Sequence, residues 1–175
     1  ATVIEAGPCP VTQLKEQPKK SFQIGYGSCK KMTKALSGHL KGKNLKHLRE
    51  FPIDDENSEI YQAEAIIDLK ILDTKKTVDI VGISKGKGFA GTVKRYHFKI
   101  GPKSHGSKHH RRPGSTGGRF PQHTVKGRKM PGRMGNEQVT TKNLTILRVE
   151  PEKNLLVVRG AVPGTKNKLV IIKQK

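Results

Sequence analysis

Apolar residues lie in short runs that Gly and Pro interrupt, a pattern typical of strands joined by turns. The runs predict strands at 2–6, 11–14, 22–26, 65–69, 77–83, 139–149, 155–159 and 169–172. Glu150-Pro151-Glu152-Lys153-Asn154 separates two of them, which predicts a turn and a β-hairpin. At 30–40 and 45–49, propensity does not decide between short helices and basic loops. So many short strands predict a mainly β fold, a small β-barrel with a few short helices.

Residues 97–135 interrupt this pattern. Their large apolar residues follow no helical or strand period and are Phe98, Ile100, Phe120, Val125, Met130 and Met134. An irregular loop of this length is usually functional or disordered. Because strand-like sequence lies on both sides, we expect an internal extension that becomes ordered against a partner. The predicted organisation is a barrel of residues 1–96 plus 136–175, with loop and short-helix insertions, and an extended loop of residues 97–135.

Charge identifies the kind of partner. The chain has 35 Lys and Arg against 14 Asp and Glu, a net charge of +21. Residues 84–135 hold 14 of these cations with five His, 11 Gly and no acid, so they carry two-thirds of the net charge. A surplus of this size repels itself unless a polyanion neutralises it, and nucleic acid is the leading candidate. An anionic membrane surface is a weaker candidate, because no long amphipathic basic helix is present. No run of 18 apolar residues occurs, so we expect no segment that spans a membrane.

Two motifs suggest enzymes and are set aside. Residues 86–91 spell GKGFAG, the pattern of a dinucleotide-binding loop, after a predicted strand. No acidic residue for a ribose follows about 20 residues later, and no second strand of a βαβ unit follows. The glycines instead suit a backbone that approaches a phosphate, with Lys85 and Lys87 as counter-charges. Nucleophilic catalysis would need an orienting carboxylate, which this stretch lacks, so we predict a protein that is not an enzyme.

The histidines and cysteines do not form a metal site. His97, His105, His109, His110 and His123 have no Cys or carboxylate among them, and the neighbouring cations would repel a metal ion. Cys9 and Cys29 form no CxxC pair and are predicted to be reduced thiols. We therefore expect no cofactor, with Mg²⁺ present only as an ion bound to RNA.

The remaining interpretation of residues 84–135 is that they form a surface that binds structured RNA. Glycine has no side chain, so a glycine-rich backbone can pass between RNA helices. Lys and Arg neutralise phosphates, and proline limits the entropy lost on ordering. Histidine in such a setting stacks on bases or donates to phosphate. The predicted RNA-binding residues are Lys85, Lys87, Lys94, Arg95, Lys103, His105, Lys108, His109, His110, Arg111, Arg112, Arg119, His123, Lys126, Arg128, Lys129 and Arg133.

Several short motifs occur together in a fixed order. They are VIEAGP at 3–8, LREF at 48–51, SKGKGFAG at 84–91, SHGS at 104–107, RPGS at 112–115, KGRKM at 126–130, GRMGN at 132–136 and GAVPG at 160–164. In this combination, which covers essentially the whole chain, the sequence resembles large-subunit ribosomal protein three, the universal L-three family, of the bacterial or organellar type.

The resemblance implies a fold, partners and a location. It implies a translation-protein-type β-barrel whose internal extension reaches toward the peptidyl transferase centre. The implied partners are large-subunit ribosomal RNA of the 23S type and neighbouring large-subunit proteins, with no membrane and no homo-oligomer. The implied location is the ribosome in a bacterial cytoplasm, or alternatively in an organelle matrix or stroma. The implied function is that of a structural constituent that nucleates subunit assembly and supports the peptidyl transferase centre.

Two departures and one alternative accompany the resemblance. Family members begin with a further strand rich in Gly and Lys, upstream of the position of Ala1. Some bacterial members carry a methylated glutamine near the tip of the extension, but Gln122 does not align with it, so we predict no such modification. The alternative function is a DNA-compacting or general polyanion-binding protein, which would share the charge without needing these ordered motifs.

Overall fold

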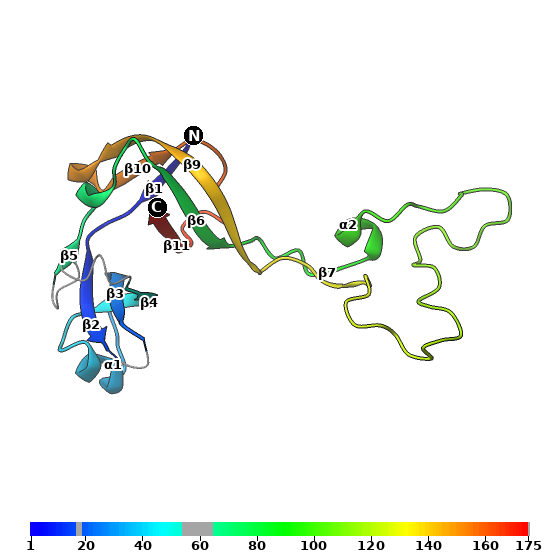
Figure 1. The fold of residues 1–175 in the computed structure, drawn as a ribbon, viewed down its shortest axis with the longest axis horizontal. Helices are drawn as coiled ribbons and strands as arrows, with labels where there is room; N and C mark the ends of the chain where they lie inside the picture. The colour runs from blue at the N-terminus through cyan, green and yellow to red at the C-terminus, as the bar shows by residue number, and fades with distance from the viewer. Residues whose placement is uncertain (17–18, 54–64, 175) are drawn as a thin grey trace. The chain divides into compact units, whose positions relative to one another are not determined.

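The computed structural model describes residues 1–16, 19–53 and 65–174 and is mainly β, as predicted (Figure 1). Its strands are β1 (Thr2–Glu5), β2 (Cys9–Lys15), β3 (Ser21–Ser28), β4 (Leu45–Pro52), β5 (Ile66–Ile67), β6 (Thr77–Ile83), β7 (Phe89–Ala90), β8 (Gly132–Arg133), β9 (Gln138–Glu150), β10 (Leu155–Val158) and β11 (Val170–Gln174). The α-helices of this part are α1 (Lys34–His39) and α2 (Thr92–Tyr96), and the 3₁₀ turns are η2 (Leu69–Ile71) and η3 (Pro151–Lys153).

The larger sheet has the strand order β1-β10-β9-β6-β11 and is curled into half a barrel (Figure 1). Strands β9 and β10 form the predicted hairpin, with Leu155 opposite Glu150. Asn154, in the left-handed conformation at φ 55°, closes its turn. Alternate residues of β10 point to the core, since Leu156 and Val158 are fully buried.

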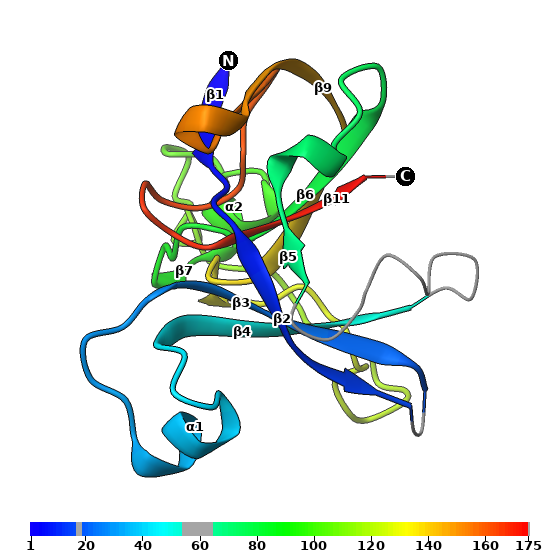
Figure 2. The ribbon, with the colours of Figure 1, turned by 90° about the vertical axis from the view of Figure 1, so that its left-hand side faces the viewer.

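The smaller sheet has the order β4-β3-β2-β5 (Figure 2). Strand β4 corrects one expectation, because residues 45–49 form neither a helix nor a basic loop but pair antiparallel with β3, with Tyr26 opposite His47. Phe22 and Phe51 face each other across this pair, with ring centroids 5.7 Å apart. The undecided stretch 30–40 contains α1, where the Thr33 hydroxyl accepts a hydrogen bond from the Leu36 N–H at 3.4 Å.

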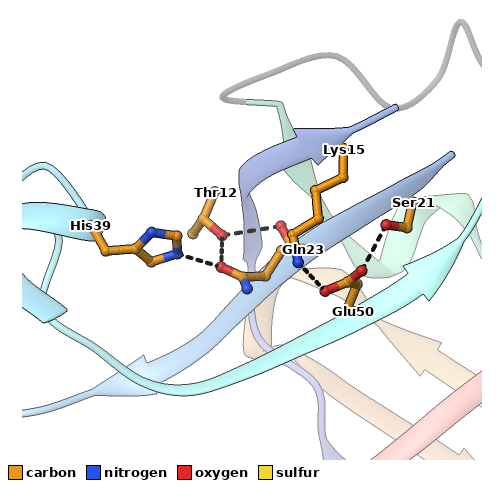
Figure 3. A network of polar contacts seen from close by, with 6 residues as sticks. All are labelled: Thr12, Lys15, Ser21, Gln23, His39 and Glu50. Atoms are coloured by element: carbon orange, nitrogen blue, oxygen red, sulfur yellow. Dashed lines mark hydrogen bonds and ion pairs between the residues drawn. The ribbon is translucent and has the colours of Figure 1, made fainter. Parts of the chain in front are cut away.

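Polar side chains tie β2, β3 and β4 together (Figure 3). Lys15 and Ser21 both donate to the carboxylate of Glu50, at 2.6 and 2.7 Å. These two hydrogen bonds, followed by the charge of Lys15, hold the pKa of Glu50 below its usual value. Thr12 donates to the Gln23 side-chain oxygen at 2.9 Å, so polar side-chain contacts join β2 to β3 as well as both strands to β4.

The chain divides into two compact units. The first, called unit 1, contains Ala1–Asp79, Lys142–Ala161 and Lys173–Lys175, and the second, called unit 2, contains Ile80–Thr141 and Val162–Ile172. From residue 91 to residue 141, Thr92 alone is buried, and residues 97–131 hold neither helix nor strand. The proposed division into a barrel and a loop of residues 97–135 has different boundaries and stays a prediction.

Candidate nucleic-acid interface

Two stretches of unit 2, residues 84–90 and 132–137, run antiparallel and are called the neck here. The Ser84 N–H donates to the Glu137 carbonyl at 2.9 Å, and the Lys87 N–H donates to the Met134 carbonyl at 2.9 Å. Further along, β7 pairs with β8, with Phe89 opposite Arg133. The backbone of the neck therefore holds Lys85, Lys87 and Arg133 of the predicted set on one two-stranded ribbon.

Glycine is required in the neck for a steric reason. Gly135 has φ 73°, and a Cβ at this position would overlap the carbonyl oxygen of Lys85. A Cβ at Gly132 would lie 2.7 Å from the guanidinium of Arg95. At Gly135, glycine thus permits close approach of two backbone segments, in addition to any approach to a phosphate.

Helix α2 places a cationic and aromatic cluster beside the neck. Half-buried Arg95 donates to the Met130 carbonyl at 3.0 Å. Its guanidinium lies 5.0 Å from the ring centroid of Tyr96, and the ammonium of Lys129 lies 5.8 Å from the same centroid. The ring of Phe98 is 6.3 Å from Tyr96. Arg95, Tyr96 and Lys129 are therefore brought together from both ends of the loop of residues 97–131.

A pocket of unit 2, called the neck pocket, opens between these groups. Its lining residues are Ser84, Lys85, Lys87, Arg95, Tyr96, Met134, Gly135, Glu137, Val162 and Gly164. Three of the predicted RNA-binding cations take part, but Tyr96 and Met134 were not among the predicted residues. The available signal was Lys94-Arg95-Tyr96-His97-Phe98, in which aromatic and basic residues alternate, as in surfaces that bind single-stranded nucleic acid.

The loop of residues 97–131 presents its cations to solvent. Of the 17 predicted residues in unit 2, Arg95 is half-buried and the other sixteen are exposed. The hydrogen bonds within the loop are local or isolated. For example, the Gly101 N–H donates to the His110 carbonyl at 2.9 Å, and Arg128 donates to the Ser115 carbonyl at 2.8 Å. The guanidinium of Arg119 lies 5.9 Å from the ring centroid of Phe120. The loop has local turns and no core of its own.

The lack of Asp and Glu in residues 84–135 determines the electrostatic potential of this stretch. Unit 1 contains ion pairs such as Lys15 with Glu50 at 2.6 Å and Arg148 with Glu150 at 2.7 Å. Residues 84–135 contain no carboxylate side chain, so none of their 14 cations has an acidic partner within the stretch. Such a concentration of one sign of charge creates a positive potential that attracts a polyanion.

The histidines of the stretch do not converge. His110 Nδ1 donates to the Pro102 carbonyl at 2.8 Å, and His123 Nδ1 donates to the Pro121 carbonyl at 2.8 Å. Within residues 1–16, 19–53 and 65–174 no group of three or more His, Cys, Asp or Glu side chains is placed to hold a metal ion. The GKGFAG motif is followed by α2, but β7 pairs antiparallel with β8 and not as part of a parallel βαβ unit.

A second acid-free stretch, residues 17–49, has nine Lys and Arg and was missed in the sequence analysis. Its exposed cations around α1 and β4 are Lys30, Lys31, Lys34, Lys41, Lys43, Lys46 and Arg49. Burial, followed by the charges of Lys46 and Arg49, lowers the pKa of His47. The same count of acids that identified residues 84–135 would have found this stretch.

Among the described helices, none has the length and apolar character needed to cross a membrane.

These features define a class of protein, a mainly β chain that carries a strongly cationic segment with almost no core. A family model for ribosomal protein L3 matches residues 56–155. The "Large ribosomal subunit protein uL3" of Carboxydothermus hydrogenoformans is 48% identical, covering 99% of this chain and 86% of the relative. The protein of the same name from Heliobacterium modesticaldum is 47% identical, with 98% and 85% covered. The "Large ribosomal subunit protein uL3c" of Guillardia theta is 45% identical, with 98% and 88% covered.

The chain belongs to the ribosomal protein L3 family. Membership confirms the predicted family and the predicted ribosomal location. It makes the chain a structural ribosomal protein of the large subunit.

Proposed function

We propose that this chain binds large-subunit ribosomal RNA directly through residues 84–135, nucleates folding of that RNA during assembly, and supports the peptidyl transferase centre through its loop. Its partners are then 23S-type RNA and neighbouring large-subunit proteins, and Mg²⁺ takes part only as an ion bound to the RNA. The observation that carries the proposal is the acid-free stretch of residues 84–135. In it, 16 of the 17 predicted residues are exposed, and from residue 91 to residue 135 only Thr92 is buried.

The proposed mechanism is insertion between RNA helices. Residues 97–135 number 39, so a chain folded out and back spans roughly 60 Å when extended. Because this segment lacks a core, phosphates and RNA helices would supply the contacts that order it. The cations would read the shape of the RNA more than its base sequence, since phosphate contacts carry no sequence information.

Salt dependence tests the electrostatic part of this proposal. If about half of the 14 cations meet phosphates, log affinity for large-subunit RNA should fall against log salt with a slope of roughly −5. The measurement is filter binding or fluorescence anisotropy across a salt series. A flat response would contradict the proposal.

Competition separates the proposal from the alternative of a DNA-compacting or polyanion-binding protein. Folded large-subunit RNA should compete for the protein more strongly than duplex DNA of equal phosphate content at the same salt. Equal competition would favour the general polyanion-binding function.

A further inference from the structure

We propose that the neck pocket holds one unpaired nucleotide of the bound RNA, with its base against Tyr96 and Met134 and its phosphates beside Lys85 and Lys87. The inference rests on the proposed function, because only a protein bound to RNA meets such a nucleotide. It adds a specific site for a base to a surface otherwise expected to contact phosphates.

The lining fits a nucleotide better than a phosphate alone. A phosphate needs cations, and Lys85, Lys87 and Arg95 provide them. Tyr96, Met134 and Val162 add apolar and aromatic surface that a phosphate does not use. A nucleobase has both requirements, because its flat face stacks on an aromatic ring while its phosphates pair with Lys and Arg. In a duplex this face is covered by neighbouring bases, so the occupant must be unstacked.

Contacts within the chain position several groups in and around the pocket. Arg95 is held by its hydrogen bond to the Met130 carbonyl at 3.0 Å, beside the ring of Tyr96. Phe98 lies next to the same ring, with the two centroids 6.3 Å apart. Gly135 lines the pocket without a side chain that would fill it. A site built from positioned groups loses less conformational entropy on binding, which favours affinity for a small occupant.

The single carboxylate of the lining has a separate role. Glu137 can only accept hydrogen bonds while ionised, and it repels phosphate. Its carboxylate therefore suits the amino or ring N–H groups on the edge of a base. A base can use this acceptor, whereas a second phosphate cannot.

Other aromatic residues of unit 2 offer matched controls. Phe89 is 80% exposed and Phe120 is 75% exposed, and neither lines the neck pocket. Phe120 also has a neighbouring cation, since Arg119 lies 5.9 Å from its ring centroid. If a base stacked on any exposed aromatic ring, it would bind at these two residues as readily as at Tyr96.

The test compares two RNA hairpins that differ only by one bulged nucleotide, each bound to the full-length chain. The wild-type protein should bind the bulged hairpin about ten-fold more tightly than the perfect hairpin, the size expected for one stacked base. Tyr96→Leu should remove this preference, so that the variant binds the two hairpins with equal affinity. Tyr96→Phe should keep it, because the phenyl ring still stacks. Phe89→Leu and Phe120→Leu should also keep it.

The outcomes separate this inference from the proposed function. If neither hairpin binds, and folded large-subunit RNA does not bind either, the proposed function fails. If both hairpins bind equally and Tyr96→Leu changes neither, RNA binding stands and the nucleotide site is wrong. Circular dichroism of each variant checks folding. If Tyr96→Leu unfolds the protein, the preference of the Tyr96→Phe variant and the crosslink described next decide.

A photocrosslink locates the base directly. With 4-thiouridine as the bulged nucleotide, irradiation should attach the RNA to the peptide that contains Tyr96 or the one that contains Met134, as read by mass spectrometry. Attachment to the peptides of Phe89 or Phe120 instead would overturn the inference.

Discussion

Unit 1 and unit 2 reach order by different means. Of the buried apolar side chains in the described part of the chain, ten lie in unit 1, and unit 2 has Ile80, Val81 and Ala90. Unit 1 also has ion pairs and the polar contacts around Glu50. In unit 2 the neck depends on backbone hydrogen bonds and glycine, and the loop beyond it is almost entirely exposed. Unit 1 therefore carries the stability of the free protein, whereas the loop of unit 2 needs contacts with a partner to become ordered.

The largest expected effect is the loss of unfolding free energy when a buried side chain of unit 1 is truncated. Leu156→Ala removes a fully buried side chain and should lower the free energy of unfolding by about 2–5 kcal/mol. Phe120→Ala in the loop should stay within about 0.5 kcal/mol, because Phe120 is 75% exposed. Urea titration followed by circular dichroism measures both. Similar losses for the two variants would refute the contrast between the units.

The next effect concerns the neck. Gly135→Ala forces a side chain onto a residue at φ 73° and against the Lys85 carbonyl, which should cost about 1–3 kcal/mol locally. Hydrogen exchange of the Lys87 and Met134 amides should accelerate while β10 amides stay protected. Gly114→Ala is the control, because a Cβ at Gly114 meets nothing within 4 Å. Unchanged exchange in the neck would mean that backbone pairing there tolerates the side chain.

A deletion within the loop should separate folding from RNA binding. Removing residues 114–126 takes away Arg119 and Lys126, so the salt slope of RNA binding should become shallower by roughly 1.4, about 0.7 for each cation. The far-ultraviolet circular dichroism of the sheets should remain, because these residues lie in neither helix nor strand and none is buried. Subunit assembly should also be impaired. Loss of the β signal would contradict the independence of unit 1 from the loop.

The smallest effect is a pH dependence within unit 1. Hydrogen bonds from Lys15 and Ser21 lower the pKa of Glu50 from its reference value of 4.5, so they stabilise the fold above that pH. This contribution should disappear as the pH falls through the lowered pKa of the folded state. Glu50→Gln should therefore lower Tm slightly at neutral pH and match the wild type in strong acid. Glu152→Gln controls for the loss of one negative charge, and an equal effect of the two variants would exclude a specific role for Glu50.

Several elements were predictable from local sequence. Strand β6 has the predicted bounds, 77–83, because its run of apolar and β-branched residues has one dominant preference, and Val78 and Ile80 are fully buried. The hairpin of β9 and β10 followed from the turn at 150–154. Strand β4 was not predictable in this way. Its residues Lys46, His47 and Arg49 hide the alternation, and only pairing with β3 selects the extended conformation.

The candidate site also has features that the sequence predicts and features that only the tertiary structure shows. By itself, the sequence determined the cationic stretch, its glycine content and the lack of a core between residues 97 and 135, because charge and apolar periodicity can be read along the chain without knowledge of the fold. The tertiary structure alone decided that residues 84–90 meet residues 132–137, since that pairing joins positions about 50 apart through backbone groups that every residue has. It also decided that Arg95, Tyr96 and Lys129 lie together beside a pocket, which no local pattern encodes.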